Sequence, residues 1–227
     1  MTDIAAEWRK TLDDLVAATQ ARTQTEVSSW ATAGRATKDK PNGDDLDFWR
    51  KEGVGQLEGY VEWLQSTDWV FADIDGEPMI EFKVEAEFGG VPVKGVIDGL
   101  MVTADGELGA LDWKTGSRTP ESSIQLGLYA ACLERMGYPR PSFGAYFMTR
   151  KRTMTAPESL EKYTPYFFDH QFSMFRLAVE NEIFIPDVAS HCRTCSVRTA
   201  CFAVGGTDAY LYDPMHPAYK PKQDTNK

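Results

Sequence analysis

Residues able to bind a metal ion and act on a phosphate stand together in the stretch Leu111-Asp112-Trp113-Lys114-Thr115-Gly116. Side chains of an extended strand alternate between its two faces, so we expect Asp112 and Lys114 to point one way and Trp113 the other. A carboxylate supplies the hard oxygen that Mg²⁺ prefers, and a nearby lysine can act on a water molecule or a phosphate. The pattern indicates a Mg²⁺ site, although an Asp-x-Lys pair by itself is more often a surface ion pair.

A second carboxylate, Asp98, interrupts the otherwise apolar run from Val91 to Val102, which reads as a strand. Asp105-Gly106 marks a tight turn between this run and the Asp112 strand. A hairpin of this kind can bring Asp98 beside Asp112. Two carboxylates and a lysine would then converge, which strengthens the interpretation of the stretch as a metal site.

A helix is expected after this motif, with Thr119 as its N-cap, Pro120 in the first helical position and Gly137 at its end. Gln125 and Tyr129 are four residues apart, which places them on one face of that helix. The face could carry polar groups toward the Asp112 strand. Ordinary packing of a helix on a sheet is the alternative explanation for the pair.

The order Gly95-x-x-Asp98, then Asp112-Trp113-Lys114-Thr115-Gly116, then Gln125-x-x-x-Tyr129 resembles the PD-(D/E)XK nuclease superfamily. Within it, the sequence is most similar to the RecB-like exonucleases, which include CRISPR-adaptation exonucleases and phage recombination nucleases. The resemblance extends roughly from Ile80 to Gly206. It implies an α/β fold of the restriction-endonuclease type, with a mixed sheet flanked by helices.

The resemblance also implies a function: a metal-dependent DNA exonuclease that hydrolyses phosphodiester bonds in DNA recombination, repair or phage DNA processing. Asp98 and Asp112 would hold one or two Mg²⁺ or Mn²⁺ ions, with the main-chain carbonyl of Trp113 as a further ligand. Lys114 would orient or help deprotonate the attacking water and stabilise the charge that develops on the phosphate. Gln125 and Tyr129 would position the phosphate backbone.

The same resemblance indicates one further catalytic candidate and one departure from the pattern of the relatives. Apolar and charged residues alternate from Ile80 to Phe88, which indicates a half-buried antiparallel strand. Relatives often carry a glutamate early on this strand near the active site, and Glu81 is the candidate here. Many RecB-like relatives also carry a metal-binding histidine on a helix like the one expected from Leu46 to Gln65. Gln56 or Glu58 would occupy that position here.

Three cysteines follow the pattern Cys192-x₂-Cys195-x₅-Cys201, which in a chain with a cytosolic character favours metal or cluster ligands over disulfides. The pattern resembles that of the cluster-bearing RecB-like nucleases, in which a fourth cysteine comes from far upstream. Residues 1 to 131 contain no cysteine, so the fourth ligand would be Cys132 or His191. A 4Fe–4S cluster, Zn²⁺ and free thiols all remain open.

Composition and charge limit the range of partners. The 227 residues have a net charge of −10, which is unfavourable for contact with DNA phosphates. The basic cluster Arg150, Lys151 and Arg152 follows an expected strand at 143–148 and is the best candidate for a DNA-backbone contact, with a solvated loop tip as the alternative. Neither a membrane-spanning run nor a signal peptide pattern is present, so we expect a cytoplasmic protein with no membrane partner.

The chain organisation expected from these patterns has four parts. Residues 1–70 would form an N-terminal helical part, 71–186 the catalytic core, 187–206 a cysteine-rich clamp and 207–227 an extended tail. The substrate would be DNA as single strands or ends, with a helicase or recombinase partner left open. The alternative function is a non-catalytic DNA-binding or scaffold module that retains the fold. A metal-dependent hydrolase with a substrate other than DNA is a third reading, and the acidity would favour it.

Overall fold

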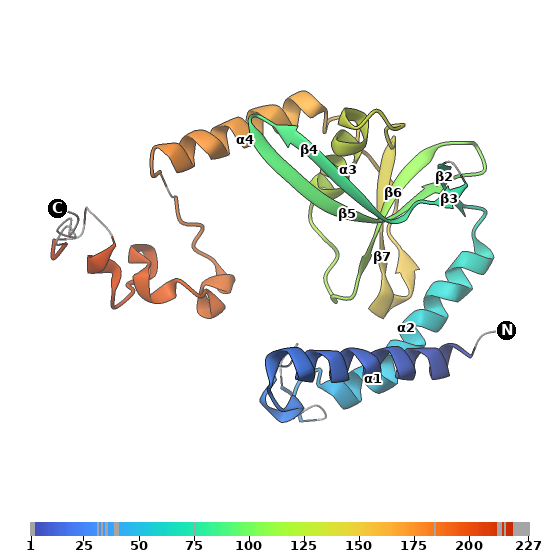
Figure 1. The fold of residues 1–227 in the computed structure, drawn as a ribbon, viewed down its shortest axis with the longest axis horizontal. Coiled ribbons are helices and arrows are strands. Elements are labelled where there is room, and N and C mark those ends of the chain that lie inside the picture. The colour runs from blue at the N-terminus through green and yellow to red at the C-terminus, as the bar shows by residue number, and fades with distance from the viewer. Residues whose placement is uncertain are drawn as a thin grey trace. The chain divides into compact units, whose positions relative to one another are not determined.

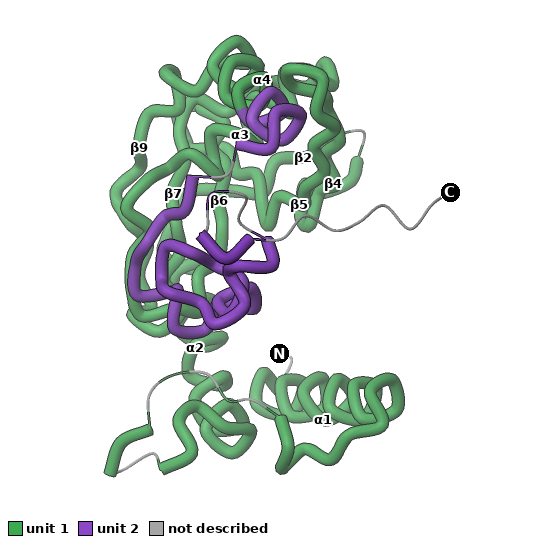
Figure 2. Tube along the Cα trace, turned by 90° about the vertical axis from the view of Figure 1, so that its left-hand side faces the viewer, with its two compact units in different colours: residues 1–174 green, residues 175–227 purple. Residues whose placement is uncertain are grey.

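The computed structural model describes residues 3–30, 32, 34, 36–38, 41–74, 76–183, 185–212, 215 and 217–219. The chain divides into two compact units, Met1–Met174 and Phe175–Lys227, which Figure 2 shows in different colours. All of the predicted nuclease motifs lie in the first unit, and the three clustered cysteines lie in the second. The four-part division expected from the sequence stays a prediction, and residues 213, 214, 216 and 220–227 of its tail lie outside the described residues.

The first unit is built on a mixed sheet, which confirms the expected α/β class (Figure 1). Its seven described strands are β1 (Val70–Phe71), β4 (Ile80–Phe88), β5 (Val91–Val102), β6 (Leu108–Lys114), β7 (Phe143–Met148), β8 (Thr153–Met154) and β9 (Glu158–Ser159). β5 pairs antiparallel with β1, β4 and β6, whereas β6 and β7 run parallel. β8 and β9 pair antiparallel with β7, and the short strands β2 (Asp73–Ile74) and β3 (Glu77–Pro78) form a separate hairpin.

The sequence explains the hairpins of this sheet locally. Gly89 and Gly90 join β4 to β5 with φ angles of 56° and 80°, a left-handed conformation that glycine adopts without strain. Gly106, with φ of 83°, completes the turn between β5 and β6 that the Asp105-Gly106 pair predicts. All six residues of β7 are buried, as is typical of a strand in the middle of a sheet with both faces covered.

The described residues form four α-helices: α1 (Ile4–Thr23), α2 (Leu46–Ser66), α3 (Ile124–Arg135) and α4 (Pro165–Glu180). α1 and α2 begin after the N-caps Asp3 and Asp45, whose carboxylates accept hydrogen bonds from main-chain N–H groups in the first turn, and α2 begins at the expected Leu46. α4 begins at Pro165 and ends at Glu180.

The expected start of α3 is wrong. The helix begins at Ile124 rather than at Pro120, and residues 119–123 form a loop. The main-chain oxygen of Ser122 accepts a hydrogen bond from the Tyr146 hydroxyl at 3.0 Å, and the Ser122 hydroxyl accepts one from the N–H of Ile124 at 3.1 Å. These two bonds hold the loop outside the helix, and the proline that signals a helix start stands in the loop.

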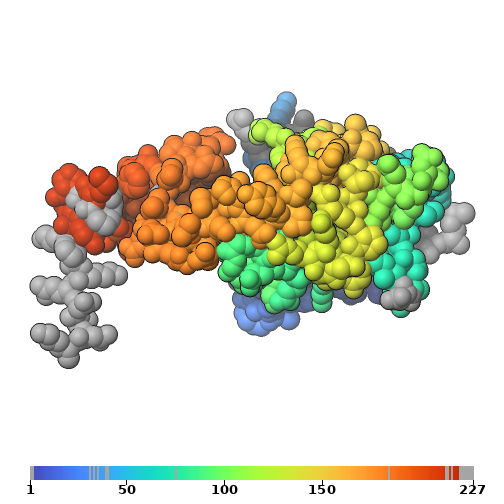
Figure 3. All heavy atoms as spheres, turned by 90° about the horizontal axis from the view of Figure 1, so that it is seen from above, coloured from blue at the N-terminus to red at the C-terminus, as the bar shows by residue number. Residues whose placement is uncertain are grey.

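Helices cover both faces of the sheet. On one face, α3 and the first half of α4 pack around a core that includes Phe88, Ile97 and Leu126. These two helix segments lie side by side (Figures 1 and 3), and Arg135 and Asp169 form an ion pair between them. On the other face, Trp63 and Leu64 near the end of α2 pack against Met101, Leu111 and Ala145. β5 and β6 are therefore held between two apolar layers.

The second unit contains the end of α4 and short 3₁₀ turns, η3 (Ser190–Thr194), η4 (Arg198–Ala200), η5 (Phe202–Val204) and η6 (Ala209–Leu211). Ala209 is the one buried residue among those described in this unit. Many of its large apolar side chains are exposed, Ile185 and Val188 among them. Over the described residues of the whole chain, no helix combines the length and apolar character needed to cross a membrane.

Candidate functional site

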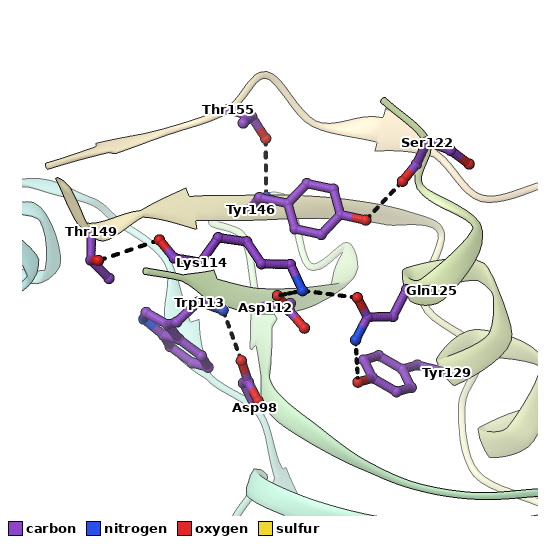
Figure 4. Close-up of polar contacts among 10 residues, drawn as sticks. All are labelled: Asp98, Asp112, Trp113, Lys114, Ser122, Gln125, Tyr129, Tyr146, Thr149 and Thr155. Carbon is purple, nitrogen blue, oxygen red and sulfur yellow. Dashed lines mark hydrogen bonds and ion pairs between the residues drawn. The ribbon is translucent and has the colours of Figure 1, made fainter. Parts of the chain in front are cut away.

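The two aspartates meet where β5 and β6 separate. The last paired residues of these strands are Gly99 and Leu111, and Asp98 and Asp112 come one residue beyond them. Here the carboxylate of Asp98 accepts a hydrogen bond from the main-chain N–H of Trp113 at 2.8 Å. A side chain thus replaces the main-chain partner at the end of the ladder. The register of the hairpin and this bond hold both carboxylates at the point where the β5–β6 ladder ends (Figure 4).

Asp112 is a buried carboxylate with 3% of its surface exposed. Its Oδ2 atom lies 2.6 Å from Nζ of Lys114 and meets no other polar partner among the described residues. Burial raises the pKa of the Asp112 carboxyl, and the nearby charge of Asp98 raises it further, whereas Lys114 lowers it. The Lys114 ammonium is therefore the one polar neighbour of this buried oxygen among the described residues.

Lys114 links the carboxylates to α3 through a chain of hydrogen bonds (Figure 4). Its ammonium group donates to Oε1 of Gln125 at 2.9 Å, and Nε2 of Gln125 donates to the hydroxyl of Tyr129 at 2.8 Å. Gln125 and Tyr129 therefore share one helix face that turns toward the strand with Lys114. Burial raises the pKa of Tyr129, and Asp112 and Asp98 add to that shift, so its hydroxyl stays protonated at neutral pH.

Tyr146 of β7 supports this arrangement, and the sequence analysis did not single it out. Nζ of Lys114 lies 5.5 Å from the centroid of its ring, and its hydroxyl holds the loop before α3 through Ser122. Its main-chain N–H donates to the hydroxyl of Thr155 at 3.0 Å. Burial raises the pKa of Tyr146 to about 12. A tyrosine inside the apolar run of β7 was the one signal in the sequence that could have identified it.

A second contact missed from the sequence joins α2 to the catalytic strand. The hydroxyl of Thr149 lies 2.5 Å from Oε1 of Gln56 and 3.3 Å from the main-chain oxygen of Lys114. Of the two residues expected in place of the histidine found in relatives, Gln56 is half-buried and makes this contact. Glu58 is exposed. The α2 residue that contacts Thr149 is therefore a neutral amide.

Glu81 lies on β4 in an unusual backbone conformation. Its φ is 49°, in the left-handed region that costs energy for a residue with a side chain. Ile80 pairs with Gly99 and Phe82 pairs with Ile97, but the Glu81 position between them, opposite Asp98, is not paired in the same way. Glu81 and Asp98 line the same cavity. The expected catalytic role of Glu81 stays a prediction, with the position of the residue in its favour.

The three residues of the basic cluster have different environments. Arg150 forms an ion pair with Asp44 at 2.7 Å and donates to the main-chain oxygen of Thr115 at 2.7 Å. Its guanidinium also stacks on the ring of Trp49, 5.1 Å from the centroid. Lys151 and Arg152 are exposed. Contact with DNA stays a prediction for all three residues, and the exposed pair is the better placed for it.

The cysteines are not gathered in the way that the spacing predicts. No group of three or more His, Cys, Asp and Glu side chains among the described residues is arranged to hold a metal ion. Cys192 instead lies 3.7 Å from the main-chain oxygen of Asp187, and Cys195 is exposed. The residues as arranged do not fit an Fe–S cluster or a structural Zn²⁺ ion.

The two residues considered for the fourth ligand have other environments. Cys132 is buried in the core of the first unit, where burial raises the pKa of its thiol to about 11, as is typical of an inert core cysteine. His191 is exposed, and its ring lies 3.0 Å from the main-chain oxygen of Asp187. The identity of a fourth ligand stays untested.

The carboxylate site fits a small divalent cation better. Asp112 offers a buried oxygen whose one polar neighbour among the described residues is Lys114, and Asp98 keeps a second carboxylate oxygen beyond its bond to Trp113. Two carboxylates and a main-chain carbonyl are the hard oxygen donors that Mg²⁺ and Mn²⁺ prefer. These residues fit the metal that the resemblance implies.

The chain has relatives among known proteins. The chain is similar to the Gene 69 protein of Mycobacterium phage D29, with 32% identity over 170 residues that cover 71% of this chain and 62% of that protein. It is also similar to the Gene 69 protein of Mycobacterium phage L5, with 33% identity over 132 residues, 55% of this chain and 44% of that protein. The matched regions thus span less than two thirds of each relative.

The family comparison covers a longer part of the chain. Residues 4–202 match the model of the PD-(D/E)XK nuclease superfamily. The match includes the strands that carry Asp98 and Asp112 and the helix that carries Gln125 and Tyr129. The mixed sheet flanked by helices is also the restriction-endonuclease-like fold expected of that family. On these grounds the chain belongs to the PD-(D/E)XK nuclease superfamily.

Proposed function

We propose that the protein is a Mg²⁺- or Mn²⁺-dependent deoxyribonuclease of the RecB-like branch, an exonuclease that acts on DNA ends or single strands. The observation that carries the proposal is the convergence of Asp98, Asp112 and Lys114 at one strand end. The match to the nuclease superfamily supports it, and the phage origin of both relatives supports a role in phage DNA processing, recombination or repair.

In this proposal Asp98, Asp112 and the main-chain carbonyl of Trp113 hold the divalent ion. When bound, such an ion lowers the pKa of a water molecule and neutralises charge on the phosphate that is attacked. The raised pKa of Asp112 sets a condition on this step, because the carboxyl must release its proton before it can act as a ligand. The site should therefore bind metal more weakly as the pH falls.

Lys114 supplies the positive charge that the reaction needs beside the carboxylates. Its ammonium group is oriented by Asp112 at 2.6 Å and by Gln125 at 2.9 Å, so its position is fixed before the substrate arrives. It orients the attacking water and stabilises the negative charge that develops on the phosphate in the transition state. Gln125 and Tyr129 hold this lysine and offer polar groups to the phosphate backbone.

Contacts outside this centre complete the proposal. Glu81 shares a cavity with Asp98 and is a candidate for an accessory role in catalysis. Lys151 and Arg152 are exposed and provide local positive charge in a chain of net charge −10. A cytoplasmic location and a helicase or recombinase partner remain predictions from the family resemblance.

The proposal is tested by incubating purified protein with end-labelled single-stranded and double-stranded DNA in Mg²⁺, in Mn²⁺ and in EDTA. Cleavage that needs metal and is lost in Asp112→Ala is the expected result. Binding without cleavage in either metal would favour the alternative, a non-catalytic module with the nuclease fold. Hydrolysis of a small phosphodiester but of no DNA would favour a substrate other than DNA.

A further inference from the structure

An aromatic cavity opens beside the carboxylates within the first unit. It has a volume of about 570 Å³, within the range of small-ligand sites. Its walls come from α1, α2 and the sheet. The aromatic lining residues are Trp8, Trp49, Tyr60, Phe71 and Trp113. All five are only half-buried, so part of their surface is free for a ligand.

The cavity borders the candidate metal site at Asp98. Asp98 and Glu81 contribute to its wall, and Trp113, another wall residue, stands between Asp112 and Lys114 on β6. Because side chains alternate along a strand, the Trp113 ring lies on the face opposite to that of the two charged residues. A base in the cavity and a phosphate at the carboxylates would therefore lie on opposite sides of β6, and Asp98 is the residue that the two regions share.

The charge of the lining decides which part of a nucleotide can enter. Among the described residues that line the cavity, none is Lys or Arg, and both of its charged residues are acidic. A phosphate would be repelled there, whereas a neutral, flat base would meet aromatic surfaces. A neighbouring polar cavity shares Gln56, and its charged lining residues are of both signs, three basic and three acidic: Lys51, Arg150 and Arg152, and Asp45, Asp47 and Glu52.

We infer that the aromatic cavity is a subsite for an unstacked nucleobase next to the scissile phosphate. Aromatic side chains stack with any base, so the subsite selects unpaired nucleotides rather than a particular sequence. A base inside an intact duplex is stacked and paired and cannot reach it. This inference rests on the proposed nuclease function and adds the substrate class: a strand with unpaired bases at the cleaved position.

The framework of the cavity is held in place before any ligand binds. The indole N–H of Trp8 donates to the main-chain oxygen of Trp49 at 3.0 Å, and the Trp8 ring lies against Gly53, where a Cβ would come within 2.2 Å of it. The ring of Tyr60 packs edge to face on Trp113, with centroids 5.5 Å apart. Burial raises the pKa of Tyr60 to about 12, so its hydroxyl stays neutral beside a base.

The test uses calorimetric titration of the full chain in EDTA, without dyes, because a dye could itself enter an aromatic cavity. A short oligothymidylate is compared with an abasic sugar–phosphate oligomer of the same length. Loss of a stacked base should weaken binding about tenfold or more. Trp49→Leu and Leu57→Ala, which alter the cavity wall, should reduce that difference.

Matched controls separate the cavity from general effects. Trp30→Leu and Leu15→Ala change the same residue types at positions that do not line the cavity, and both should keep the full preference for the base-bearing strand. Leu57 and Leu15 are 36% and 58% exposed, so their truncation should leave the fold intact. If Trp49→Leu does not fold, the comparison of Leu57→Ala with Leu15→Ala decides the outcome.

A cleavage assay in Mg²⁺ distinguishes failure of the inference from failure of the proposed function. Single strands that carry one abasic site at the cleaved position should be cut more slowly than intact strands. Equal binding and equal cleavage of both substrates would overturn the proposed subsite and would still support the proposed nuclease function. If the protein binds the base-bearing strand more tightly but cleaves neither substrate, the proposed subsite is retained and the proposed nuclease function is wrong. Self-association that Trp49→Leu abolishes would show that a second copy fills the cavity, and would also overturn the inference.

Discussion

The aspartate pair of β5 and β6 and the cysteine segment of the second unit present similar patterns in the sequence but differ in the structure. Asp98 and Asp112 are brought to one strand end by the register of a hairpin between two packed faces. Cys192, Cys195 and Cys201 lie on 3₁₀ turns or directly beside them, in a unit whose described residues have almost no buried core. Strand pairing can bring the two aspartates together before a metal binds. A segment without strand pairing, such as the one with the three cysteines, would need the bound metal to hold its ligands together.

The strongest test of this comparison is removal of Asp112 or Lys114. Asp112→Ala and Lys114→Ala should each reduce metal-dependent DNA cleavage by about a thousandfold or more, because each group acts mainly in the transition state. The measurement is the single-turnover rate on end-labelled DNA. Lys94→Ala is the matched control, since Lys94 is an exposed lysine paired with Glu85 on the same sheet.

Near-normal cleavage by either variant would remove the catalytic assignment. Circular dichroism of both variants should be unchanged, since the sheet is held by its ladder and its core rather than by this ion pair. A variant that lost its fold would instead show that the charges are structural.

The next largest effect concerns the framework around the carboxylate site. Arg150→Ala should lower the free energy of unfolding by about 3 kcal/mol, because it removes a 2.7 Å ion pair from the buried carboxylate of Asp44. Urea denaturation monitored by tryptophan fluorescence measures the change. Lys151→Ala is the control, since Lys151 is exposed and its ammonium donates only a 3.2 Å bond to Thr119. If Arg150→Ala binds DNA more weakly but is as stable as the wild type, Arg150 contacts DNA and is not a structural residue.

A smaller effect is expected at Gln125. Gln125→Ala should lower the cleavage rate by about tenfold and leave the Mg²⁺ concentration for half-maximal activity nearly unchanged, because the amide orients Lys114 and touches neither carboxylate. Metal titrations of the cleavage rate measure both quantities. A large rise in the Mg²⁺ requirement would place Gln125 among the metal ligands and contradict its assignment.

The pKa of Asp112 predicts a modest effect on stability. A carboxyl whose pKa is raised in the folded state contributes stability below its unfolded pKa, and that contribution is lost as the pH rises through the folded value. At neutral pH the ionised Asp112 should therefore cost stability. Asp112→Asn should raise the melting temperature by a few degrees at pH 7 in metal-free buffer, and the gain should vanish below about pH 4. A lower melting temperature at pH 7 would show that the ion pair with Lys114 outweighs burial.

The smallest effect is expected in the cysteine segment. Cys195→Ser should change the unfolding free energy of the first unit by no more than about 0.5 kcal/mol, as is usual for an exposed side chain. The measurement combines thermal unfolding with iron and zinc analysis of anaerobically purified protein. Stoichiometric metal in the wild type that disappears in Cys195→Ser would break the comparison, because it would show a metal gathering these cysteines.

The sequence by itself determined the chemistry of the candidate site. Alternation along β6 placed Asp112 and Lys114 on one face, and the four-residue spacing placed Gln125 and Tyr129 on one side of α3. The turn at Asp105-Gly106 set the hairpin that brings Asp98 close. These are local properties, because strand and helix periodicities and tight turns depend on a few neighbouring residues.

The tertiary structure alone decided the partners of those groups. Arg150 pairs with Asp44, which is 106 residues away, and Thr149 contacts Gln56, which is 93 residues away. The Tyr146 hydroxyl bonds to the main-chain oxygen of residue 122, which lies outside the helix although Pro120 predicts it inside. Trp8 bonds to Trp49 and lines the aromatic cavity that Asp98 also lines. Such contacts follow from how helices pack on the two faces of the sheet. Local periodicity does not encode that packing, because it is set by the fit of whole elements around a shared core.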